Sequence, residues 1–175
     1  MTLLEATLIF ATQLMDHTNH GMQYNHQVMN DAVAAIVEVT ESPQEIETLV
    51  KIARYESGAW RKEVADCRIR GDEGGALGLF QVHVFPNEKA SDACSSDYRK
   101  QVRVALAHVR NSAEICGMHG YRGSSLLTIY TNGSCRLNSS AARLRYGSGK
   151  ELQALLYTEE NEMLSKKDVP LNGCQ

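Results

Sequence analysis

The strongest structural signal in the sequence is a helix start at residues 42–45, Ser-Pro-Gln-Glu, followed by an apolar stripe. Ser42 can cap the helix with its hydroxyl, Pro43 suits the first helical position, and Glu45 can complete a capping box. At about 100° per residue, the next apolar side chains fall within about 60° of one another. They are Ile46, Leu49, Val50 and Ala53. The sequence therefore predicts a helix from Pro43 with one buried face.

Similar apolar spacing predicts further helices along the chain. They are expected at about 3–16, 24–40, 124–131, 139–146 and 150–165, and a longer one is expected to run from a cap at Ser95, Ser96 or Asp97 to about Cys116. Residues 66–76, DCRIRGDEGGA, are polar and rich in glycine, so they predict a loop or a small hairpin. The expected fold class is mainly α, of the α+β kind, with one small β-like excursion.

The composition fits one domain over residues 1–175, with 43% hydrophobic residues and no low-complexity tract or internal repeat. The first fifty residues carry seven acids and no Lys or Arg, and the remainder carries 18 bases and 14 acids, a net charge of +4. So small an excess is typical of a solvated surface. Because no basic-aromatic motif or zinc-finger spacing accompanies it, no nucleic-acid partner is expected.

The first residues, MTLLEATLIFATQLM, are apolar but lack the positive start and the cleavage site of a signal peptide. They predict an amphipathic helix of the mature chain. No apolar stretch approaches the roughly 20 residues that a membrane-spanning helix needs, so no membrane span is expected.

The cysteines Cys67, Cys94, Cys116, Cys135 and Cys174 form no CxxC motif, and their odd number leaves at least one thiol unpaired within a monomer. Without a signal peptide, synthesis in a reducing cytosol is the default. Buried thiols are therefore expected for most of them, with a disulfide framework as the alternative.

Three histidines, His17, His20 and His26, lie near the connection between the first two predicted helices. No acid or cysteine completes a convincing set of metal ligands with them. Polar surface histidines are the better interpretation, and no metal or cofactor is predicted.

Glu56 is the residue that most suggests a chemical function. The Ser57-Gly58 pair stops the helix, which places Glu56 in its last turn, about 80° from Ile46 and at the edge of the buried face. Tyr55 and Trp60 flank it and would hold the carboxyl partly out of water, which favours its protonated form. A protonated carboxyl can donate the proton that cleavage of a glycosidic bond requires.

Three segments in order, ESG at 56–58, GALGLFQVH at 75–83 and YTNG at 130–133, resemble the lytic transglycosylases and goose-type lysozymes. These families cleave peptidoglycan and belong to the lysozyme-like superfamily. The ordered triple, with its separations, is far more specific than any one piece. The likeness covers roughly residues 45–145.

The resemblance implies a lysozyme-like fold in which a catalytic core at 42–146 lies between N-terminal helices at 1–41 and a C-terminal helix and tail at 147–175. It also implies that the substrate is the glycan strand of peptidoglycan and that no cofactor is needed.

The resemblance makes Glu56 the general acid and base. Ser57 resembles a cleft serine near the sugar, Gln81 would line the glycan groove, and Tyr130 would donate a hydrogen bond to the catalytic glutamate. Asp72 precedes the glycine-rich segment in the acidic loop that goose-type enzymes share and is a further substrate-binding candidate. From the residues alone, Gln81 could equally satisfy the loop backbone and Tyr130 could belong to the core.

The reaction product stays open. A second carboxylate, Asp72 or Glu73, could activate water and make the enzyme a hydrolase, but both also fit solvated loop acids. With Glu56 alone, the muramoyl C6 hydroxyl could attack and leave a 1,6-anhydro sugar. The family pattern usually has Asn directly after Tyr, where this chain has Thr131, with Asn132 one residue later.

The expected function is cleavage of the β-1,4 bond between N-acetylmuramic acid and N-acetylglucosamine, by lytic transglycosylation or hydrolysis. The main alternative is a non-catalytic glycan-binding or assembly protein with a similar cleft, and a third possibility is a chitinase-like specificity. The expected site of action is the cell wall, reached from the cytoplasm in phage lysis, from a virion or by dedicated secretion. His83 and His108 are expected to be structural, and the oligomeric state is left open.

Overall fold

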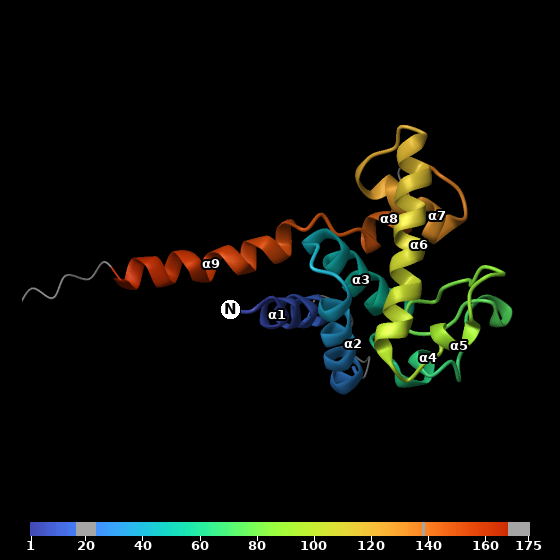
Figure 1. Ribbon diagram of the computed structural model, residues 1–175, viewed down its shortest axis with the longest axis horizontal. Helices are drawn as coiled ribbons and strands as arrows, with labels where there is room; N and C mark the ends of the chain where they lie inside the picture. Colours follow the sequence, from blue (N-terminus) through green and yellow to red (C-terminus); the bar gives the residue numbers. More distant parts are fainter. Residues whose placement is uncertain (17–23, 138, 168–175) are drawn as a thin grey trace, which may run out of the picture.

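The computed structural model describes residues 1–16, 24–137 and 139–167. Within these ranges the chain is mainly helical, and extended segments pair only through the isolated bridges Gly71–Ala76 and Leu77–Val82. Figure 1 shows helices gathered around α6 (Tyr98–Met118), with α9 (Lys150–Lys167) projecting from the body. The mainly α class expected from the sequence is confirmed.

The first half of the chain folds into α1 (Leu3–Asp16), α2 (His26–Val39) and α3 (Pro43–Glu56), close to the predicted bounds. The predicted apolar stripe of α3 is fully buried, at 0% exposure for each of Ile46, Leu49, Val50 and Ala53. This stripe fixes α3 against the core, so the position of its last residue, Glu56, is fixed as well.

The start of α3 forms only half of the predicted capping box. The Ser42 hydroxyl accepts a hydrogen bond from the Glu45 backbone N–H at 3.4 Å, as expected. The Glu45 carboxylate does not return to Ser42, because it accepts hydrogen bonds from the Thr40 hydroxyl and from the Arg110 guanidinium. A long-range ion pair to α6 therefore replaces the local contact.

The central helix, α6, packs against α2, α3, α5 (Ala90–Ala93), η2 (Gly123–Leu127) and α7 (Thr128–Asn132). Its buried Gln101 amide accepts a hydrogen bond from Leu79 N at 2.8 Å and donates to the carbonyls of Ala65 and Ser95 at 2.9 and 2.7 Å. This amide joins α6 to the loop after α4 (Lys62–Ala65), which the sequence predicts only as a polar, glycine-rich segment.

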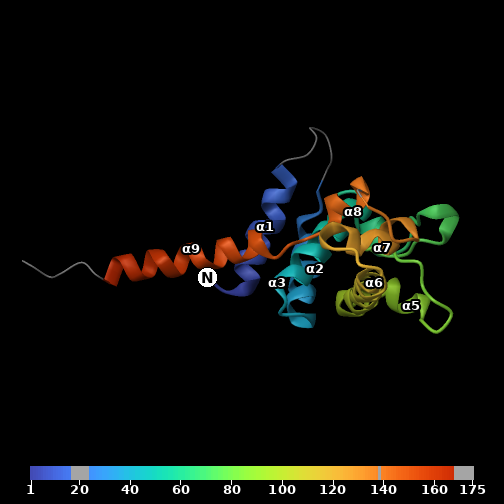
Figure 2. The same cartoon turned by 90° about the horizontal axis from the view of Figure 1, so that it is seen from above.

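The last helices of the described ranges are α8 (Ser140–Arg145) and α9, which leaves the body beside α1 in Figure 2. The first turn of α9 is held by Glu47 of α3, a side chain with no solvent exposure. Its carboxylate accepts hydrogen bonds from the N–H groups of Gly149 and Leu152 at 2.8 and 2.7 Å. Such charge-assisted bonds at a helix start stabilise the helix.

Four of the five cysteines form disulfides, Cys67–Cys94 and Cys116–Cys135, so the expectation of buried thiols is wrong for them. Each pair is brought together by a loop that returns to α6 or its flank, a long-range contact that sequence spacing does not reveal. Cys174, His17 and His20 lie outside the described residues, and His26 is the first residue of α2.

None of the helices in the described ranges combines the length and apolar character that a lipid bilayer crossing requires. The same ranges contain no group of three or more His, Cys, Asp or Glu side chains arranged to hold a metal ion.

Candidate functional site

A cavity of about 470 Å³ opens beside α6, and four segments distant in the sequence form its wall. Glu56 comes from the end of α3, His108 and Asn111 come from α6, and the other residues come from the loop at 71–85 and from the segment at 129–133. The cavity thus gathers residues of all three motifs that resemble the peptidoglycan-cleaving families.

Glu56 lies in this wall with 23% of its side chain exposed, as expected from its place at the edge of the buried stripe. The Nε atom of Arg145 donates a hydrogen bond to Glu56 Oε1 at 2.5 Å. Arg145 is itself held by the Ala141 carbonyl at 3.1 Å, and its guanidinium lies 5.7 Å from the centre of the Tyr55 ring. Arg145 is therefore a charge partner of Glu56 that the sequence does not predict.

The side chains that flank Glu56 in the sequence do not enclose its carboxyl in the expected way. Trp60 is fully buried in the core, with 0% exposure, and it does not contribute to the cavity wall. The Arg54 guanidinium lies over the Tyr55 ring, with its carbon Cζ 4.7 Å from the centre of the ring.

Tyr130 lines the cavity, but its hydroxyl donates to the Phe80 carbonyl at 2.5 Å and not to Glu56. Burial raises the pKa of this hydroxyl well above its usual value, the negative charge of Glu56 raises it further, and Arg145 partly offsets the increase. Tyr130 therefore keeps its proton and fastens the 75–83 motif to α7.

Gln81 lines the cavity, and its side chain also satisfies the loop backbone. Its Nε2 donates to the Gly78 carbonyl at 2.8 Å, and its Oε1 accepts from Gly71 N at 2.9 Å. A primary amide has two N–H groups and two acceptor lone pairs, so the side chain keeps one donor and one acceptor position for a ligand.

Asp72 also lines the cavity, where its Oδ2 lies 2.8 Å from His83 Nε2. The two side chains are largely exposed, at 74% and 61%. The neighbouring Glu73 does not contribute to the wall. Of the two loop acids that the sequence left equivalent, only Asp72 therefore lines the cavity.

Ser57 is not part of the cavity. Its side chain is buried, its hydroxyl donates to the Ala53 carbonyl at 2.5 Å, and it accepts from Trp60 N at 2.8 Å. Both hydrogen bonds close the C-terminal turn of α3, the turn that carries Glu56.

Several lining residues were not predicted as site residues: His83 and His108 were expected to be structural, and Phe85 and Asn111 were not singled out. Two signals could have indicated them. His83 and Phe85 lie two and four residues after Gln81, the spacing that keeps side chains on one side of an extended segment. His108 and Asn111 lie three residues apart, on one face of a helix.

Asn132, which stands one residue later than the Asn of the family pattern, also lines the cavity. Its side-chain oxygen accepts hydrogen bonds from the hydroxyls of Thr131 and Ser139, both at 2.7 Å. The amide of Asn132 also carries two N–H groups, which are donors that a ligand in the cavity could use.

Comparison of the chain with the models of known protein families, with curated proteins and with solved structures finds no match in any of the three.

Proposed function

We propose that this chain is a peptidoglycan-cleaving muramidase with a lysozyme-like fold, in which Glu56 is the general acid and base. The observation that carries the proposal is the place of Glu56. It is a carboxyl with only 23% of its side chain exposed, in the wall of a cavity that also offers amides, imidazoles, hydroxyls and the exposed Asp72 carboxylate. Such a wall suits a sugar, whose hydroxyl and acetamido groups need several directed hydrogen bonds.

In the proposed reaction, protonated Glu56 gives its proton to the glycosidic oxygen as the bond from that oxygen to C1 of N-acetylmuramic acid breaks. The leaving N-acetylglucosamine then departs as an alcohol and not as an alkoxide. The Glu56 carboxylate next accepts a proton from the group that attacks C1. Attack by the muramoyl C6 hydroxyl gives the 1,6-anhydro sugar, and attack by water gives the hydrolysed sugar.

The ion pair with Arg145 restricts when Glu56 can act in this reaction. Because Arg145 Nε donates a hydrogen bond to Glu56 Oε1, the pair has to open before that oxygen can reach the glycosidic oxygen. In our proposal the glycan strand separates Arg145 from Glu56 as it enters the cavity. The Asp72–His83 pair is then the group available to orient water in the hydrolytic route.

The two disulfides support action outside the reducing cytosol, because such bonds persist mainly in oxidising compartments. The cell wall is such a place. We therefore propose peptidoglycan as the partner of the chain and the cell wall as its site of action.

Mass spectrometry of digested peptidoglycan tests the proposal. The chain should release soluble muropeptides, and Glu56→Gln should release none, because the amide cannot donate the required proton. Glu114→Gln, at an exposed position of α6, is the matched control and should cleave normally. Cleavage by Glu56→Gln would defeat the assignment, and the mass of the reducing end would distinguish anhydro from hydrolysed products.

The second candidate function is glycan binding without cleavage. It is favoured by the 2.5 Å Arg145–Glu56 contact and by the Tyr130 hydroxyl, which is engaged by Phe80. Sedimentation of the chain with insoluble peptidoglycan, with no soluble fragment released, would select this function over the first.

A further inference from the structure

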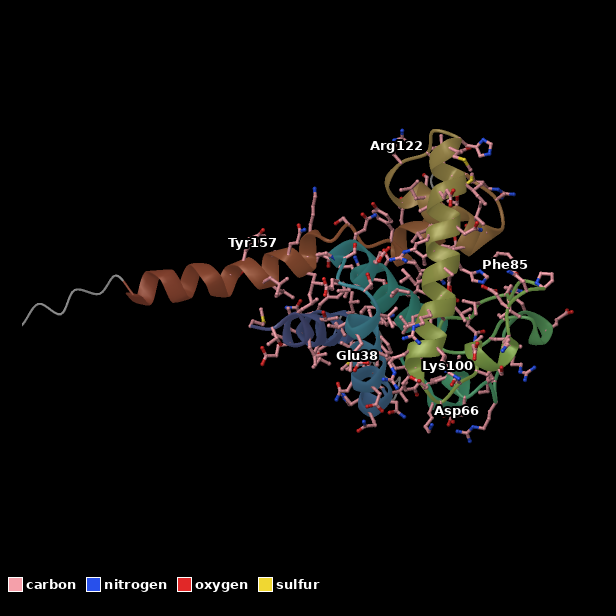
Figure 3. The ribbon with its side chains drawn as sticks, viewed as in Figure 1. Glu38, Asp66, Phe85, Lys100, Arg122 and Tyr157 are labelled. Atoms are coloured by element: carbon pink, nitrogen blue, oxygen red, sulfur yellow. A yellow bond between two sulfur atoms is a disulfide. The ribbon has the colours of Figure 1, made fainter. Side chains whose placement is uncertain are left out.

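The cavity contains one large apolar side chain that is open to solvent, Phe85, with 43% exposure. Figure 3 shows it on the loop beside α6. Its ring is stacked on His108 of α6, with ring centres 4.4 Å apart and planes 4° from parallel. One face of Phe85 is therefore covered by an imidazole, so the exposed area of the side chain lies on its opposite face and its edges.

A single carboxylate oxygen holds both stacked residues. Oε2 of Glu88 accepts a hydrogen bond from Phe85 N at 2.7 Å and lies 2.8 Å from His108 Nε2. The side chains of Glu88 and His108 are only 18% and 10% exposed. Because the ring is already fixed, a ligand that packs on it avoids much of the entropic cost of ordering a side chain.

An exposed ring that borders a set of hydrogen-bonding groups selects a ligand with one apolar face and a polar edge. A β-linked N-acetylhexosamine has this form, because its axial C–H groups gather on the faces of the ring while its hydroxyls point outward. The C–H groups carry a small positive charge, and the face of an aromatic ring is negative. Asn111 and Asn132, in the same wall, offer amides to the polar edge.

We propose that Phe85, supported by His108 and Glu88, is a stacking subsite for an N-acetylhexosamine ring of the glycan strand. The subsite rests on the proposed function, since it sets where the strand lies relative to Glu56. Phe85 is then a specificity-determining residue, and His108 and Glu88 are positioning residues behind it.

Binding is measured in the Glu56→Gln background, so that no substrate is consumed. The probes are chitohexaose and peptide-free glycan strands of peptidoglycan, titrated by calorimetry into the full chain. Replacement of Phe85 by Leu keeps an apolar side chain but removes the ring, and it should weaken binding roughly three- to tenfold. Phe85→Trp should restore the affinity.

Ile69→Ala is the matched control. Ile69 is an exposed apolar residue in the same disulfide loop, at 41% exposure, but it is not part of the cavity wall. This variant should bind as the parent does. Proton NMR gives a second readout, since stacking on Phe85 shifts the sugar ring C–H protons upfield, and Phe85→Leu should abolish that shift.

Unchanged affinity in a folded Phe85→Leu variant would overturn the subsite, and so would a parent protein that binds neither probe. These failures are distinguishable from failure of the proposed function. If Phe85→Leu weakens binding while Glu56→Gln still cleaves, the subsite stands and the catalytic assignment falls. If Glu56→Gln is inactive and Phe85→Leu binds normally, the reverse holds.

Discussion

Replacement of Gly78 by alanine should destabilise the protein far more than the same change at Gly74. Both glycines lie in the loop that carries the cavity wall, and both have a positive φ, +68° and +100°. A side chain in this conformation costs about 1–2 kcal/mol, partly offset by about 0.4–1 kcal/mol because alanine restricts the unfolded chain. The backbone alone therefore predicts small and similar losses.

The surroundings of the two glycines differ. A Cβ at Gly78 would lie 1.9 Å from the Ala93 carbonyl oxygen and 2.7 Å from Gln101 Oε1, whereas a Cβ at Gly74 meets nothing within 4 Å. The loop must then move, at about 1–3 kcal/mol for overpacking. The hydrogen bond from Leu79 N to Gln101 is also lost, at about 1–3 kcal/mol. Gly78→Ala should thus cost at least about 2 kcal/mol more than Gly74→Ala.

Urea unfolding followed by tryptophan fluorescence measures this difference. Trp60 is the only tryptophan of the sequence and is fully buried, so its emission reports exposure of the core. With a slope of about 2 kcal/mol per molar urea, the two midpoints should differ by about 1 M. Equal midpoints would show that the close approach of Gly78 to Ala93 does not constrain the loop, and the reasoning would fail.

Glu47→Gln should lose about 1.5–3 kcal/mol of stability by the same assay, because the buried carboxylate caps α9, whereas Glu151→Gln, whose carboxylate is 57% exposed, should lose less than about 1 kcal/mol; equal losses would contradict the capping role. Arg110 lowers the pKa of Glu45 from its usual 4.5, with burial opposing and Thr40 assisting. The stability from this pair is therefore present above pH 4.5 and is lost as the pH falls through the lowered pKa, and Arg110→Gln should remove that part of the pH dependence, by less than about 1 kcal/mol, in unfolding curves at pH 7 and pH 3. Reduction of the two disulfides, which span 27 and 19 residues, should cost about 3–4 kcal/mol each in a chain-entropy treatment, and peptide mapping after alkylation should find the four cysteines unreactive until a reductant is added.

The helices were predictable because their signals are local. The Ser42-Pro43 start, the stripe from Ile46 to Ala53 and the Ser57-Gly58 stop define α3 within the sequence itself, and Glu56 follows from its bounds. The contacts at the candidate site, in contrast, join residues that are far apart in the sequence. Arg145 reaches Glu56 across 89 residues, and no periodicity within either helix indicates that pair.

The residues that line the cavity were predictable only where they belong to a motif or loop that resembles the known families. Gln81, Asp72 and Tyr130 reach the cavity as the resemblance implied, but the hydroxyl of Tyr130 has a different partner. Ser57 was misplaced because a serine after a helix serves its own backbone as readily as a ligand. His108 was expected to be structural, because its partners come from a loop that a disulfide and the Gln101 amide join to α6 and its flank, and neither contact is local in sequence.

The disulfides have a consequence for proteolysis. The cavity-wall segment at 71–85 lies entirely between Cys67 and Cys94, and the segment at 129–133 lies between Cys116 and Cys135. Each wall segment is thus part of a closed covalent ring. An endopeptidase that cuts one peptide bond in either ring opens the ring but releases no fragment, so a nicked molecule keeps both walls attached to α6.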